Sequence, residues 1–127
     1  MRFSTKANLR ITNMRLYEIY DNNNSDNLAA YNSLPVLAQY FVTTQQKLLC
    51  EKIDKKVLET YGPEAIKSLN KIAGFYIASN DDNCVLHTFG MAADFAKTGL
   101  FAKVAIPTCC NLICLDKQTH WHVQFKK

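Results

Sequence analysis

The sequence predicts a single α+β domain, because helical periodicity dominates its first half and short strand-like runs cluster in its last third. A chain of 127 residues is long enough to bury one hydrophobic core, so we expect one domain over residues 1–127. Its 48% hydrophobic and 20% charged content is typical of a globular protein. We expect N-terminal helices packed on a small antiparallel sheet, in a monomer.

The first half contains the helical patterns. Apolar residues in 1–20 are spaced loosely as on a helix, and the polar run 21–27 is typical of a loop. After Pro35, apolar residues recur at three- and four-residue steps as far as Tyr61. This pattern predicts one long amphipathic helix that ends at Gly62 and Pro63.

The second half contains the strand patterns. A short amphipathic piece at 64–69 leads into residues 71–78, whose aromatic and β-branched content predicts a strand. The polar run 79–83 then breaks the pattern. Short apolar runs separated by turn signals follow, and they predict further strands. These runs are 91–95, 100–106, 111–115 and 120–125.

Charge and cysteine content exclude several classes of protein. The net charge of +4 is mild, and the three arginines, Arg2, Arg10 and Arg15, all lie in the first segment, so we expect no nucleic-acid partner. Five cysteines in irregular spacing favour a reducing compartment. Because no apolar run approaches the roughly 20 residues that span a bilayer, we expect a soluble chain without membrane insertion. No signal peptide is visible, so a target in the cell wall would require synthesis in the cytoplasm followed by release.

The three histidines lie in two short stretches that also hold the strongest candidate for a metal site. His120 and His122 are two positions apart on a predicted strand, so their imidazoles share one face and Trp121 lies on the other. Asp94 follows His87 by seven positions in an apolar run, where an unpaired carboxylate would be costly to bury.

A cation beside Asp94 would remove that cost. Gly90 permits a tight turn between His87 and Asp94, and Ala92 and Ala93 leave space around a metal. A His, an Asp and a second His would leave one coordination position open, as in catalytic zinc sites. The sequence therefore indicates a site for one Zn²⁺ per chain.

The motifs carry a family resemblance. Residues 87 to 94 match the H-x-x-G-x-A-x-D signature of the zinc D-Ala-D-Ala carboxypeptidases and related phage endolysins, and residues 120 to 123 resemble their closing H-x-H motif. Residues 74 to 76 are similar to the S-G-Y-R strand that precedes the first ligand in that family. The likeness covers roughly residues 35 to 125 and implies the hedgehog/DD-peptidase fold.

The resemblance also implies roles for particular residues. It makes His87, Asp94 and His122 the zinc ligands, and it makes Asp116, six positions before His122, the general base. His120 would stabilise the charge that develops when a zinc-activated water attacks the scissile carbonyl. The implied function is a metallopeptidase, a carboxypeptidase or endolysin whose substrates are peptidoglycan peptides with D-amino acids.

The chain departs from the family pattern around the substrate. Val85 stands where the family has a serine, and Tyr76 or Ile77 stands where it has the arginine that grips the substrate carboxylate. The hydroxyl of Tyr76 is the group we expect to contact substrate in its place. These departures keep open a second interpretation, a catalytically inactive zinc-binding module of the same fold. In a third, the histidines are merely structural.

Two further alternatives concern Asp116 and the cysteines near the C-terminus. Asp116 also fits a plain polar turn, in which case a water-bridged His120 would be the base. Cys109, Cys110 and Cys114 could be read as a second metal cluster. Their spacing does not match a C-x-x-C metal knuckle, so we expect buried apolar thiols there.

Overall fold

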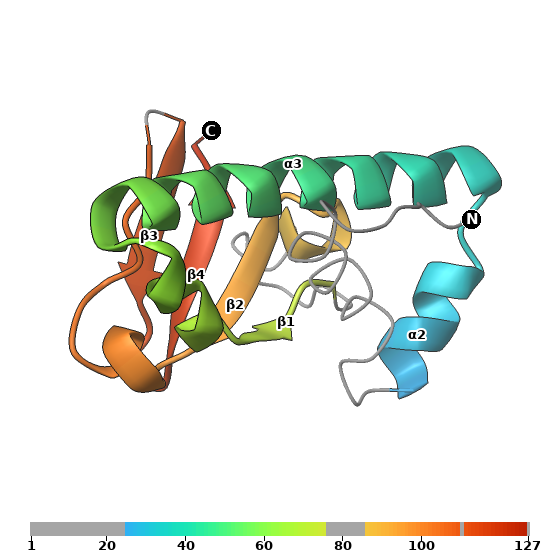
Figure 1. Ribbon diagram of the computed structural model, residues 1–127. Helices are drawn as coiled ribbons and strands as arrows, with labels where there is room; N and C mark the ends of the chain where they lie inside the picture. Colours follow the sequence, from blue (N-terminus) through green and yellow to red (C-terminus); the bar gives the residue numbers. More distant parts are fainter. Residues whose placement is uncertain (1–24, 76–85, 110, 127) are drawn as a thin grey trace.

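The protein consists of one long helix packed against a four-stranded antiparallel sheet (Figure 1). The structure is a computed structural model that describes residues 25–75, 86–109 and 111–126. Helix α3 (Val36–Tyr61) lies across one face of the sheet, and its N-terminal part extends past the strands toward helix α2 (Ser25–Asn32). This arrangement confirms the predicted α+β class. The helix predicted within residues 1–20 lies outside the described residues.

The predicted long helix is confirmed at both ends. Pro35 immediately precedes α3, and Gly62 ends it with a φ of 88°, donating its backbone N–H to the carbonyl of Leu58 at 3.0 Å. The predicted loop at 21–27 is wrong where it is described, because Ser25 begins α2. Serine and the following aspartate are residues that favour a helix start, which explains why a polar run became helical.

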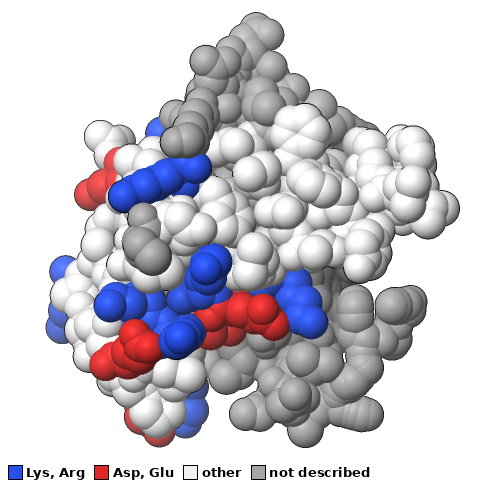
Figure 2. All heavy atoms as spheres, turned by 90° about the horizontal axis from the view of Figure 1, so that it is seen from above, with Lys and Arg blue, Asp and Glu red and all other residues white. Residues whose placement is uncertain are grey.

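The buried face of α3 is narrower than its apolar pattern suggested. The side chains that it buries follow a helical stripe, namely Val42, Gln46, Leu49, Cys50, Ile53, Asp54 and Val57. Several large apolar side chains near its start point to solvent instead: Val36, Leu37, Tyr40 and Phe41. Figure 2 shows that charged side chains cover part of this surface and leave a broad uncharged area beside them. None of the described helices is long and apolar enough to cross a membrane.

The strands form one sheet in the order β1-β2-β4-β3, in which every neighbouring pair is antiparallel. Their bounds are Lys71–Ala73 for β1, Ala92–Ala96 for β2, Leu112–Asp116 for β3 and His120–Phe125 for β4. Strands β2 and β4 lie at the centre, so both are paired on each side. The predicted runs at 91–95, 111–115 and 120–125 are thus confirmed as strands.

The predicted strand at 100–106 is wrong, because its first part is the 3-10 helix η2 (Gly99–Ala102). Gly99 has a φ of 56°, which turns the chain out of an extended path. Phe101 is then fully buried, and its carbonyl accepts a hydrogen bond from Trp121 Nε1 at 2.8 Å. The amphipathic piece predicted at 64–69 is also a 3-10 helix, η1 (Pro63–Ser68).

The two faces of the sheet carry different chemistry. Ala93 pairs with Val123 and Phe95 with Trp121, and these side chains point toward the core beneath α3. The alternate positions, Ala92, Asp94 and Ala96, pair with Gln124, His122 and His120. The polar residues of the two central strands therefore gather on the face away from the hydrophobic core.

Gln46 connects α3 to the chain around the candidate ligands. Its side chain is fully buried, and its amide nitrogen lies 3.3 Å from the carbonyls of Gly74 and Gly90 and 3.4 Å from that of Ala92. Its amide oxygen accepts a hydrogen bond from the buried Lys71 Nζ at 3.1 Å. The amide of Gln46 thus makes hydrogen-bonding contacts with buried polar groups of β1, of β2 and of the turn before β2.

We predict that Gln46→Leu destabilises the protein by about 2–4 kcal/mol, because it removes two N–H donors shared among three buried carbonyls and the acceptor of the buried Lys71 ammonium. Gln45→Leu is the matched control, since Gln45 occupies the same helix but is only half-buried. Urea unfolding of both variants measures the difference. Equal stability of the two variants would contradict the role given to Gln46.

Candidate metal centre

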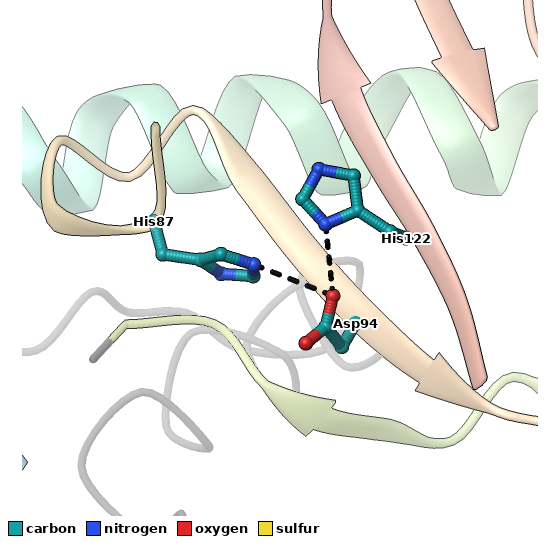
Figure 3. A group of neighbouring side chains, drawn as sticks. All are labelled: His87, Asp94 and His122. Atoms are coloured by element: carbon teal, nitrogen blue, oxygen red, sulfur yellow. Dashed lines mark hydrogen bonds and ion pairs between the residues drawn. The ribbon is translucent and has the colours of Figure 1, made fainter. Parts of the chain in front are cut away.

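Three side chains from separate parts of the chain converge on the face of the sheet opposite α3 (Figure 3). Asp94 lies on β2, His122 lies directly opposite it on β4, and His87 comes from a helical turn at residues 86–88. All three are buried, with exposed fractions of 0% for His87, 6% for Asp94 and 3% for His122. The structure thus brings together the three residues that the sequence indicated as ligands.

Both imidazoles point at the same carboxylate oxygen. His122 Nδ1 lies 3.1 Å and His87 Nε2 lies 3.3 Å from Asp94 Oδ1. The two rings stand at 70° to one another, with centroids 5.1 Å apart. One nitrogen from each histidine and one oxygen of the aspartate therefore surround a common point, and these atoms all lie within 4.8 Å of one another.

The two nitrogen–oxygen separations in this group are close to those around a tetrahedral metal ion. Metal bonds of about 2.0–2.1 Å to nitrogen or oxygen place neighbouring ligand atoms about 3.3 Å apart in a tetrahedron. The two separations from Asp94 Oδ1, 3.1 and 3.3 Å, are close to that value. Within residues 25–75, 86–109 and 111–126, this is the one group of His, Cys, Asp or Glu side chains close enough to hold a metal ion.

The protonation states also suit a cation. Burial lowers the pKa of His87, which favours the neutral imidazole that binds metals. Burial alone would raise the pKa of Asp94, but its close contacts with His122 and His87 outweigh burial and hold that pKa well below its usual range. The cluster therefore combines an ionised carboxylate with a neutral ring.

His122 faces an oxygen on each side of its ring. Its Nδ1 lies near Asp94 Oδ1, and its Nε2 lies 2.7 Å from Gln124 Oε1. A neutral imidazole carries one hydrogen and can donate to only one of these oxygens. When Nε2 donates to Gln124, Nδ1 presents a lone pair to the carboxylate. A cation between Nδ1 and Oδ1 would turn that repulsion into attraction.

The turn after His87 sets its position. The Gly90 N–H donates to the His87 carbonyl at 3.0 Å, and the Met91 N–H donates to the Leu86 carbonyl at 2.8 Å. Gly90 has a φ of 75°, and a Cβ at this position would overlap the Val42 carbonyl oxygen of α3. The tight turn expected at Gly90 is therefore present. At this turn the backbone of Gly90 also lies very close to the backbone of α3 at Val42.

The space expected around a metal is present at only one of the two alanines. Ala92 lies on the same face of β2 as Asp94, in register with Gln124. Ala93 points to the other face, where it packs in the hydrophobic core. The expectation for Ala93 is wrong because neighbouring residues of a strand point to opposite faces.

His120 lies beside the cluster on the same face of β4. Its Nε2 is 3.5 Å from Asp94 Oδ2, and its Nδ1 is 3.0 Å from the hydroxyl of Thr119. The side chain is 27% exposed, so solvent and small molecules can reach it. A ring fixed at Nδ1 and open at Nε2 can hold or transfer a proton next to the metal site.

The structure does not bring Asp116 to the cluster. Asp116 pairs with Trp121 across β3 and β4, so its side chain lies on the face opposite His120 and His122. Its carboxylate accepts hydrogen bonds from Lys97 Nζ at 2.5 Å and from the Gln118 backbone at 2.9 Å, and the bond to Lys97 lowers its pKa. Lys97 also lies over the Trp121 ring, 4.3 Å from its centroid. The expected general base is therefore part of a surface ion pair.

The remaining candidates are placed as follows. Tyr76, expected to contact substrate, lies outside the described residues, as does Cys110. Cys109 and Cys114 are half-buried, and burial raises the pKa of the Cys114 thiol, in keeping with apolar packing. Sequence reasoning missed Gln124 and Gln46. Gln124 could have been found from the period of a strand, because it is two positions after His122 and shares its face.

Comparisons with known protein families, with characterised proteins and with solved structures gave no match for this chain.

We predict that Gly90→Ala destabilises the protein by about 2 kcal/mol or more, because the methyl group collides with α3 and the backbone must hold a positive φ. Gly62→Ala is the matched control. It has a φ of 88°, but no atom lies within 4 Å of the added carbon, so it carries the backbone cost without the collision. Urea unfolding should show the larger loss at Gly90. An equal loss in both variants would exclude the collision.

We predict that the metal-free protein becomes less stable as the pH falls below 6.5, the ordinary histidine value. The pKa of His87 is lower in the folded protein than in the unfolded chain, so the unfolded chain takes up a proton on this ring at a higher pH. Folding stability is therefore lost from about pH 6.5 downward, until the pH has passed the folded-state pKa. The slope is at most about 1.4 kcal/mol per pH unit for this one group. Urea unfolding in a chelator from pH 7.5 to 5 measures it. His87→Asn should flatten the slope, and an unchanged slope would assign it to other groups.

Proposed function

We propose that this protein is a zinc-dependent peptidase of the hedgehog/DD-peptidase fold that hydrolyses peptidoglycan peptides. The observation that carries the proposal is the convergence of His87 Nε2 and His122 Nδ1 on one oxygen of the buried Asp94. These are the three residues that the family motifs assign as ligands, in the same order along the chain. An α+β fold with the cluster on the face of a small antiparallel sheet away from α3 is consistent with that family.

The three ligands leave one position for water or substrate. A bound zinc ion would supply a Lewis acid that activates water and polarises a carbonyl. The burial of His87, Asp94 and His122 excludes bulk water from the ligand side and keeps the site in a medium of low dielectric. The protein side chains must then bind the peptide and move protons.

His120 is the residue we assign to proton transfer. It is on the correct face, and its Nε2 stands near the second oxygen of Asp94. An imidazole can act as a general base and as a general acid, so it could accept a proton from the attacking water and return it to the leaving amine. Asp116 takes no part in this scheme, because Lys97 holds it on the other face.

The substrate class follows from the family resemblance. Peptides that end in D-Ala-D-Ala, or that contain D-amino acids within peptidoglycan, are the substrates it implies. Tyr76 stays a prediction for substrate contact.

One observation favours a second function, a zinc-binding module without turnover. Asp94 is the only carboxylate among the described residues that pairs with the histidines of the cluster, and it is already a candidate ligand. Hydrolytic zinc sites commonly use a further carboxylate as the base. A binding module would keep the metal and lack hydrolysis.

We predict about one zinc per chain by elemental mass spectrometry, with loss of the metal in His122→Ala and retention in His120→Ala. Hydrolysis of a muropeptide ending in D-Ala-D-Ala should fall by about 10²–10⁴-fold in His120→Ala, the range for loss of an acid–base group. Product release is followed by mass spectrometry of the cleaved peptide.

Asp116→Asn is the matched control, since it removes a carboxylate that we place outside the reaction. It should keep both zinc and turnover. A protein with zinc but no turnover on such peptides would support the binding module. A protein that takes up no metal, even with zinc added, would exclude both functions.

A further inference from the structure

Gln124 is a buried polar residue that the proposed reaction does not use. Its side chain is 4% exposed and lies on the same face of β4 as His122, two positions away. Its Oε1 is 2.7 Å from His122 Nε2, which is shorter than the contacts of 3.1–3.5 Å between the three histidines and Asp94. A contact of this length between a ring nitrogen and an amide oxygen is a hydrogen bond.

The direction of this bond depends on the tautomer of His122. The amide oxygen of glutamine is an acceptor only, so the bond forms in the tautomer that carries the ring hydrogen on Nε2. The tautomer with hydrogen on Nε2 leaves the lone pair of His122 on Nδ1. Nδ1 is the atom that faces Asp94 Oδ1, at 3.1 Å. The bond to Gln124 therefore selects the ring nitrogen that can bind a metal.

We propose that Gln124 is the positioning residue of the metal centre, which holds His122 in the tautomer and orientation that present Nδ1 to the ion. This inference rests on the metal-binding part of the proposed function. Ligating histidines generally donate their second N–H to an acceptor, and loss of that acceptor weakens metal binding by about 10–100-fold. Gln124 supplies this acceptor from the same strand, without help from a loop.

The neutral amide also sets the charge of the centre. A carboxylate at this position would draw the Nε2 proton and make the imidazole a stronger donor to the ion. An amide accepts the hydrogen bond and leaves Asp94 as the one anion among the ligands and their described partners. A zinc ion held in this way would keep a net positive charge and act as a stronger Lewis acid.

The test compares zinc affinity in four forms of the protein, measured by competition with a chromogenic chelator. Gln124→Leu and Gln124→Met lack the acceptor but keep a long side chain, and both should bind zinc about 10–100-fold more weakly than the wild type. Gln124→Glu keeps an acceptor and should bind zinc at least as tightly. Ile113→Ala is the matched control, because Ile113 is the cross-strand neighbour of Gln124 and should leave the affinity within about threefold.

Cobalt-substituted protein provides a readout that a purely structural role would not move. Loss of the acceptor should shift the visible absorption bands of Co²⁺ in Gln124→Leu, and Gln124→Glu should restore a tetrahedral spectrum. Use of two variants without the acceptor guards against one that fails to fold, since a folded Gln124→Met still decides the matter.

The outcomes separate the two proposals. Wild-type affinity in Gln124→Leu or Gln124→Met would overturn the role of Gln124 and leave the metal centre standing. An equal loss in Gln124→Glu would also overturn it, because the amide shape and not the acceptor would then matter. A wild-type protein that binds neither zinc nor cobalt would overturn the metal centre and this inference together.

Discussion

The arrangement of the cluster depends on one carboxylate held inside the sheet. Asp94 is 6% exposed on a central strand, and an ionised carboxylate in such a place costs several kcal/mol unless it is well paired. Imidazoles meet both of its oxygens, His87 and His122 at Oδ1 and His120 at Oδ2. All three histidines of the chain contact the carboxylate of Asp94. The structure therefore keeps a buried anion at a place where a cation could bind.

The helix behind the sheet supports the ligands indirectly. Gln46 contacts the carbonyls of Gly90 and Ala92 within the segment that links His87 to Asp94, and Gly90 lets that segment lie against α3. A ligand on a turn is placed less firmly than a ligand on a strand, so His87 needs this support more than His122 does. The buried polar network of α3 therefore supports the His87, Asp94 and His122 cluster, although the two lie on opposite sides of the sheet.

The sequence was sufficient to pick out the His87, Asp94 and His122 group because local spacing brings these residues together. His87, Gly90 and Asp94 lie within one turn and one strand, and the period of a strand places His120 and His122 on one face. The structure places Asp116 on the other face, which its spacing alone did not indicate, because that face depends on how β3 and β4 pair, and the turn at 117–119 sets that register. Gln46 gave no local signal, since a glutamine on a helix normally faces water.

The hydrophobic core and the cluster are linked through the register of β2 and β4. Ala93 and Val123 pair on the core face, and this pairing sets Asp94 opposite His122 on the other. A slip of one residue would turn Asp94 and His122 into the core and expose Val123 and Phe125. That exchange would bury a charge among apolar side chains, which is far more costly than the native pairing. The apolar packing beneath α3 therefore determines that the two central ligands meet.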